Sequence, residues 1–352
     1  MNSFIYGYLG AFLLTLIITP LIVKFARKLG VMDHPGIERK LHFKPTPLLG
    51  GLAIYISFVI ITALFGFFTP DLIKGYFHWN HLLGIYVAGF VLMTGGFLDD
   101  KLNLSANKQI IFPTVAALIA VVSGITIKAL TIPTGGTFHF DESILFSAII
   151  TFLWLLGMMY TTKYLDGLDG LVSGVGLIAS IIVFFVAQHE TLQQDYIALL
   201  SIIVAGILCG FLIYNFFPAS IFLGEGGSLF IGFLIGVLSI VSGTKIATTL
   251  LIFGIPILDV VWVILRRYFT GQKIYSADKK HLHHRLLAIG LTHKGAVLFI
   301  YSVTALFGLT AVFVQTLYKI YALGILVVFM VGLGMYLVIL SRKRGMSLDS
   351  KH

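Results

Sequence analysis

Long runs of apolar residues separated by short polar segments dominate this 352-residue chain. In lipid, backbone polar groups must be hydrogen-bonded within their own segment, so about 20 consecutive apolar residues predict a membrane-spanning helix. We predict eleven such helices, at about residues 4–23, 48–68, 82–98, 110–130, 144–160, 171–188, 196–214, 228–243, 246–265, 295–317 and 320–340. The expected fold class is an all-α, polytopic membrane helical bundle.

The composition supports a membrane location. Hydrophobic residues make up 58% of the chain and charged residues 11%, whereas soluble domains carry about 25% charged residues. The longest polar stretch, 266–294, is too short to form a separate soluble domain, and no repeat or linker divides the chain. We therefore predict a single integral membrane domain over residues 1–352.

Basic residues predict the orientation of the bundle. Lys24, Arg27 and Lys28 follow the first apolar run, which lacks the features of a cleaved signal peptide. Alternating the loops from there places 20 of the 24 lysines and arginines on the inside. By the positive-inside rule, the N-terminus lies outside and the C-terminus in the cytoplasm. The net charge of +9 thus reflects topology, with attraction to anionic headgroups or an anionic substrate, and not nucleic-acid binding.

Acidic residues cluster in the loops predicted to be cytoplasmic. Asp99 and Asp100 end one apolar run, Asp166 and Asp169 lie between two others, and Glu225 precedes another. Ionisable residues at the membrane are a functional hypothesis by default. We expect one active site at the cytoplasmic face, formed by loops 24–47, 99–109, 161–170, 215–227 and 266–294. The single Cys209 has no partner for a disulfide.

Each acidic cluster also has a structural interpretation. Charged residues such as Asp99 and Asp100 often end a membrane helix, although two adjacent carboxylates repel unless a cation is near, which suits a metal site or proton acceptor. Asp166 and Asp169 would share one helix face, or Asp169 would cap the following helix. Glu225 lies in a glycine-rich helix start of the kind that suits phosphate and a neutralising cation.

Glycines in two further places suggest specific packing. Gly232 and Gly236 form a small-xxx-small pair that predicts close helix packing. Paired prolines and glycines at 45–51 indicate a shaped loop that a basic juxtamembrane stretch does not explain.

The largest inner loop carries His281, His283, His284 and Arg285. Three clustered histidines allow a zinc site, but zinc ligands are usually more widely spaced and include a cysteine or an acid. Cationic imidazoles and Arg285 directed at a phosphate or diphosphate are the favoured interpretation.

Together these motifs resemble the polyprenyl-phosphate N-acetylhexosamine-1-phosphate transferases, of the glycosyltransferase family 4 type. Five blocks carry the resemblance in family order: Asp33-x-Pro35-x-x-x-Arg39-Lys40-x-His42 with Pro45, Pro47, Gly50 and Gly51; Asp99-Asp100; Asp166-Gly167-x-Asp169-Gly170-Leu171; Gly224-Glu225-x-Gly227-Ser228; and His281-x-His283-His284-Arg285. The last block is more similar to the enzymes that start wall teichoic acid, O-antigen or enterobacterial common antigen chains. Such enzymes move a sugar 1-phosphate from a UDP-sugar to a polyprenyl phosphate and release UMP.

The resemblance implies a role for each block. Mg²⁺, with Mn²⁺ as a substitute, offsets the repulsion between two anionic substrates. Asp99 or Asp100 activates the lipid phosphate, Asp166 and Asp169 are catalytic and organise metal and nucleotide, and Glu225 and Asp166 hold the metal. Much of the acceptor phosphate is already dianionic at neutral pH, since its second pKa is about 6, so positioning outweighs proton removal.

The resemblance also implies the substrate-binding residues, the partners and the location. The substrate-binding residues are Arg39, Lys40, His42, Lys108, Lys163, Gly227, Ser228, His281, His283, His284 and Arg285. The partners are a UDP-N-acetylhexosamine, in first place UDP-GlcNAc, and undecaprenyl or another polyprenyl phosphate in the cytoplasmic membrane. A homodimer is one oligomeric state open to the chain.

Three positions depart from the family pattern. The family usually has Asn where this chain has Tyr160 and Lys163, and Asp where it has Glu225. We hypothesise that Lys163 contacts phosphate and that the longer Glu225 reaches the metal. These departures leave a non-catalytic binder of polyprenyl phosphate or nucleotide sugar as the alternative. An ion-coupled transporter is less favoured, because its acids normally lie near the membrane midplane and its halves often show repeat symmetry.

Overall fold

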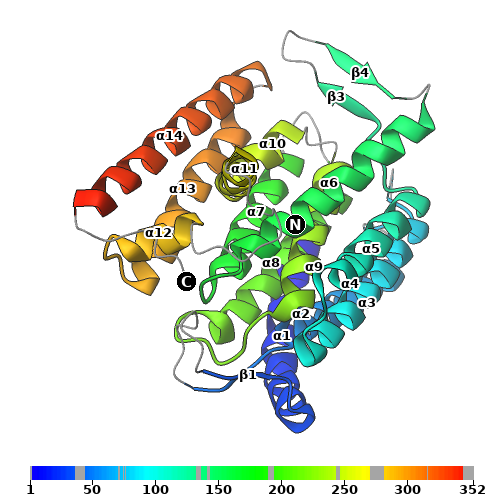
Figure 1. The fold of residues 1–352 in the computed structure, drawn as a ribbon. Coiled ribbons are helices and arrows are strands. Elements are labelled where there is room, and N and C mark those ends of the chain that lie inside the picture. Colours follow the sequence, from blue (N-terminus) through cyan, green and yellow to red (C-terminus); the bar gives the residue numbers. More distant parts are fainter. Residues whose placement is uncertain are drawn as a thin grey trace.

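The computed structural model describes residues 2–35, 44–69, 72–73, 75, 77–131, 136–140, 143–188, 194–242, 246–269, 281–314 and 316–343. This part of the chain is mainly helical (Figure 1). The helices are α1 (Asn2–Leu29), α2 (Gly50–Phe68), α3 (Trp79–Leu102), α4 (Ala106–Gln109), α5 (Ile111–Val122), α6 (Ile144–Leu165), α7 (Leu171–Ala187), α8 (Asp195–Asn215), α9 (Gly224–Val241), α10 (Ile246–Ile252), α11 (Gly254–Phe269), α12 (Leu282–Ala288), α13 (His293–Phe313) and α14 (Thr316–Lys343). The strands are β1 (Met32–Asp33), β2 (Thr46–Pro47), β3 (Ala129–Thr131) and β4 (Thr137–His139).

The prediction of an all-α, polytopic membrane protein is confirmed. Within the described residues, eight helices are long and apolar enough to cross a membrane: α1, α2, α3, α6, α8, α9, α13 and α14. Two further apolar stretches, Ala106–Val122 and Leu171–Ala187, are helical but shorter. The apolar run at 246–265 forms two consecutive helices, α10 and α11, where the sequence predicted one.

Helix α9 is the central element of the bundle. Almost all of its residues are buried, and it packs against α2, α3, α6 and α7. Its glycines permit this packing because they let neighbouring backbones approach closely. Gly232 and Gly236 lie against Met158 of α6, which confirms the packing role predicted for this pair.

The bundle has a short two-stranded sheet at each end (Figure 1). Strands β1 and β2 pair antiparallel at the end where α1 and α3 finish, and β3 and β4 pair antiparallel at the other end. Next to β2, the N–H groups of Gly50 and Gly51 donate to the carbonyl oxygens of Phe222 and Leu223, at 2.9 and 2.8 Å. The proline- and glycine-rich loop is therefore held against the segment that leads into α9.

Candidate active site

A polar cavity of about 470 Å³ lies at the end of the bundle that carries β1 and β2. This volume is in the range of small-molecule sites, about 300–1,000 Å³. Residues from five separated stretches of the chain line it, and seven of them are predicted site residues: Asp100, Lys163, Asp166, Asp169, Glu225, Ser228 and His284. The cavity lies where the C-terminal ends of α3, α6 and α8 meet the N-terminal end of α9, so carboxylates that are far apart in the sequence lie close together.

The two adjacent aspartates at the end of α3 have different surroundings. Asp99 Oδ1 accepts hydrogen bonds from the backbone N–H of Leu104 and from Nε2 of Gln109, both at 2.9 Å. Asp100 Oδ1 accepts from the backbone N–H of Glu225 at 3.2 Å, at the start of α9. Asp100 lines the polar cavity and also a neighbouring apolar cavity of about 300 Å³ between α1, α2, α3 and α9. Asp100 is therefore the member of the pair that faces the cavities.

Asp166 and Asp169 lie in the turn between α6 and α7 and both line the cavity. Asp169 Oδ2 accepts a hydrogen bond from the backbone N–H of Ala219 at 2.9 Å, and its own N–H donates to Nε2 of His293. Among the described residues, none donates a hydrogen bond to the Asp166 carboxylate, which is exposed to the cavity. Asp169 is thus fixed by the protein, whereas Asp166 is open to a ligand.

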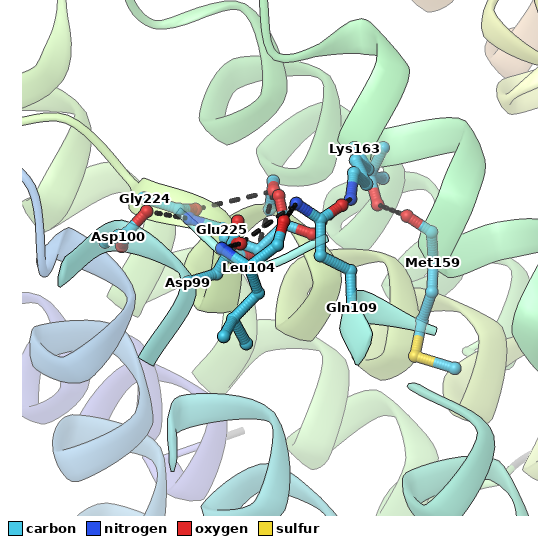
Figure 2. Close-up of polar contacts among 10 residues, drawn as sticks. Asp99, Asp100, Leu104, Gln109, Met159, Lys163, Gly224 and Glu225 are labelled. Atoms are coloured by element: carbon cyan, nitrogen blue, oxygen red, sulfur yellow. Dashed lines mark hydrogen bonds and ion pairs between the residues drawn. The ribbon is translucent and has the colours of Figure 1, made fainter. Parts of the chain in front are cut away.

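Lys163 and Gln109 link Glu225 to Asp99 in one network (Figure 2). Its Nζ forms an ion pair with Glu225 Oε1 at 2.5 Å and donates to Oε1 of Gln109 at 3.0 Å. Gln109 Nε2 in turn donates to Asp99. Two of the positions that depart from the family pattern, Lys163 and Glu225, are therefore the two partners of one ion pair.

The charge of the site fits a divalent cation. Asp166 is exposed to the cavity, and desolvation by the surrounding protein, together with Glu225, Asp100 and Asp169, raises its pKa to about 8. Such a carboxyl gains from a nearby cation. Within the described residues, no group of three or more His, Cys, Asp or Glu side chains has metal-binding spacing. Mg²⁺ is usually held by one or two carboxylates plus substrate phosphates, so the open Asp166 suits it.

The histidine block is divided between two environments. His284 lines the polar cavity, whereas His281 Nδ1 pairs with Asp259 Oδ2 of α11 at 2.8 Å. Burial, followed by His284 and His281, holds the pKa of His283 well below its usual value. The expectation of cationic imidazoles is therefore wrong for His283, because a neutral ring is favoured where water is excluded.

His283 instead fixes α12 against the aspartate turn. A Cβ on Gly167 would lie 2.1 Å from His283 Nε2, so only glycine leaves room for this ring. The packing places His284, the next residue, at the cavity.

Some predicted substrate-binding residues lie elsewhere. Lys108 is exposed on α4 and does not line the cavity. Gly227 packs on the backbone of Gly51, and Arg285 lines a different, apolar cavity between α11, α12 and α14. The predicted residues Arg39, Lys40 and His42 lie outside the described residues.

Sequence reasoning missed three polar residues of this region. Gln109 links Asp99 to Lys163, and Asn215 and His293 line the cavity. Each stands at a boundary between a predicted cytoplasmic loop and an apolar run. A polar residue at such a boundary is the signal that could have identified them.

Comparisons with known proteins agree with these motifs. The family model described as glycosyl transferase family 4 matches residues 82–243. A probable undecaprenyl-phosphate N-acetylglucosaminyl 1-phosphate transferase of Bacillus subtilis is 33% identical over 94% of this chain and 91% of its own length. A decaprenyl-phosphate N-acetylglucosaminephosphotransferase of Mycolicibacterium smegmatis is 34% identical over 83% of this chain and 77% of its own length. A phospho-N-acetylmuramoyl-pentapeptide-transferase of Oceanobacillus iheyensis is 29% identical over 87% and 95%, respectively.

Proposed function

Because the chain belongs to glycosyl transferase family 4, we propose that it transfers N-acetylglucosamine 1-phosphate from UDP-GlcNAc to a polyprenyl phosphate and releases UMP. The relatives at 33% and 34% identity are named for N-acetylglucosamine and for undecaprenyl or decaprenyl phosphate, which supports this donor and this class of acceptor. The product would initiate a cell-envelope polysaccharide.

One structural observation carries the proposal. Asp100 lies at the junction of a polar cavity that contains Asp166 and Asp169 and an apolar cavity formed by four helices. A polyprenyl phosphate joins a hydrocarbon chain to an anionic head, so its two parts have the polarity of the two cavities. A UDP-sugar enters from water and can place its diphosphate near the same carboxylates.

The proposed roles follow from the contacts. Mg²⁺, when bound beside Asp166, would neutralise negative charge on the two phosphate substrates. Asp100 would orient the acceptor phosphate, and Asp169, held by Ala219, would keep the turn in place. His284, which also lines the cavity, would contact the diphosphate or sugar.

We propose the cytoplasmic membrane as the location, with the N-terminus outside and the cavity at the cytoplasmic face. The excess of lysine and arginine in the loops at the cavity end supports this orientation. UDP-sugars are made in the cytoplasm, so this face would have access to the donor.

A cysteine placed by mutation at the start of α1 should react with an impermeant thiol reagent in intact cells, and one in the 99–109 loop should not.

The direct test is UMP release by the purified protein in detergent. With undecaprenyl phosphate, UDP-GlcNAc and Mg²⁺, we expect UMP and a lipid-linked GlcNAc diphosphate in equal amounts. Omission of the lipid is the control for simple hydrolysis. No UMP from any UDP-N-acetylhexosamine would favour the non-catalytic binder.

The raised pKa of Asp166 predicts that Mg²⁺ stabilises the protein more as pH increases. Between the ordinary carboxyl pKa and about 8, the folded protein holds a proton that the unfolded chain releases, so the cation-free protein loses stability as pH rises. Mg²⁺ replaces that proton. Thermal unfolding in detergent should therefore show a larger Mg²⁺-induced increase in Tm at about pH 8 than at about pH 5. An equal increase at both pH values, or the same trend in Asp166→Asn, contradicts the prediction.

A further inference from the structure

The ion pair between Lys163 and Glu225 makes Glu225 different from Asp166: the Glu225 carboxylate is paired with an ammonium group, and among the described residues the Asp166 carboxylate is not. Lys163 is in the last turn of α6 and Glu225 in the first turn of α9, and their side chains are only 19% and 16% exposed. Gln109 accepts a second hydrogen bond from the same ammonium and is itself held by donating to Asp99 and to the Leu104 carbonyl. Lys163 is therefore held beside Glu225 by Gln109, which Asp99 and the Leu104 carbonyl hold in turn (Figure 2).

The pairing changes what Glu225 can offer to a metal ion. A carboxylate that is already neutralised by an ammonium group attracts a cation weakly, and the ammonium repels that cation. Asp166 is in the opposite state, because it faces the cavity with no hydrogen-bond donor among the described residues. The two acids that the sequence assigned together to the metal are thus not equivalent.

We propose that Lys163 is an internal counter-ion that withholds Glu225 from the divalent cation and leaves Asp166 as the carboxylate that binds it. The inference rests on the proposed function only for the physiological identity of the cation. Lys163 and Gln109 act as positioning residues: they set which carboxylate receives the cation, and they connect this choice to Asp99. The hypothesis that Glu225 itself reaches the metal is replaced by this one.

The test measures Mn²⁺ binding to the purified full-length protein in detergent without substrates. Electron paramagnetic resonance gives the concentration of free Mn²⁺ and hence the dissociation constant. Lys163→Met frees Glu225 and removes a repelling charge, so the Mn²⁺ dissociation constant should fall by about tenfold or more. Glu225→Gln leaves Lys163 unpaired beside the site, so the dissociation constant should rise. The double variant replaces a neutral pair by a neutral pair, and its affinity should return to within about threefold of wild type.

The double variant distinguishes the two assignments. If Glu225 were a metal ligand, the double variant would lack that ligand and would bind Mn²⁺ well over threefold more weakly than wild type, and the proposal would be overturned. Lys163→Arg keeps the charge and should preserve the wild-type affinity, and Lys128→Met, at the other end of the bundle, is the matched lysine control. If Lys163→Met does not fold, as judged by thermal unfolding, Lys163→Gln takes its place in the cycle.

This experiment fails independently of the proposed function. A protein that releases no UMP but shows the expected Mn²⁺ cycle contradicts the proposed reaction and retains the internal counter-ion. A protein that releases UMP but whose double variant stays weak retains the reaction and contradicts the counter-ion.

Discussion

Replacing Asp166 with asparagine is expected to lower the rate of UMP release by about 10³-fold, the upper part of the range for removing one preorganised electrostatic group from an active site. Asparagine keeps the size of the side chain but removes the negative charge from a cavity-lining aspartate to which no described residue donates a hydrogen bond. The effect should be in kcat at saturating substrates. Mn²⁺ binding without substrates should be lost in parallel.

The matched control is Asp195→Asn. Asp195 is the first residue of α8, at the opposite end of that helix from the cavity, and accepts a hydrogen bond from Gln188. Its replacement should leave UMP release within about twofold of wild type, as is usual for an exposed surface position. Activity of Asp166→Asn within tenfold of wild type would contradict the role assigned to Asp166.

The general architecture follows from the sequence because lipid imposes a strict rule on the backbone. An apolar run must satisfy its own hydrogen bonds, so residues 144–160 or 196–214 can hardly be other than helical. The same rule places charged residues at helix ends. It does not say where a helix is interrupted: the break between α10 and α11 falls at Phe253, next to Gly254 and Pro256, and Pro256 has no N–H to donate to the Ile252 carbonyl.

The site could be predicted as a set of loops but not as a set of contacts. Sequence spacing and resemblance brought Asp100, Asp166 and Glu225 to one site, and all three line one cavity. Neither could show that Lys163 would pair with Glu225, 62 residues away, because this pairing depends on how α6 and α9 are rotated. The contact between His281 and Asp259 could not be predicted either, because it depends on how the start of α12 packs against α11.

The close contact between α3 and α9 explains how the carboxylates are held in register. Gly96 of α3 lies directly on the backbone of Gly226, and a Cβ at position 96 would be only 2.2 Å from the Gly226 nitrogen. Asp100 is one helical turn beyond Gly96, and Glu225 is adjacent to Gly226. The separation of the two helices therefore sets the distance between Asp100 and the N–H of Glu225.

Gly96→Ala is accordingly expected to lower both stability and activity. The methyl group meets backbone atoms, which cannot rotate away, so α3 and α9 must move apart at a cost of about 1–3 kcal/mol or more. Thermal unfolding in detergent should show a clearly lower Tm. UMP release should fall by about a hundredfold even where the variant is folded, because misplacing reacting groups by about 1 Å has an effect of that size.

Gly157→Ala is the control that separates this contact from a general sensitivity of helical glycines. Gly157 is in the interior of α6, and a Cβ there would meet nothing within 4 Å. Alanine is favoured over glycine inside a helix by about 1 kcal/mol, so the Tm of this variant should be unchanged or higher. Equal losses of Tm in the two variants would show that the contact between Gly96 and Gly226 does not determine the geometry of the site. Opposite changes would tie the position of Asp100 to the backbone contact between Gly96 and Gly226.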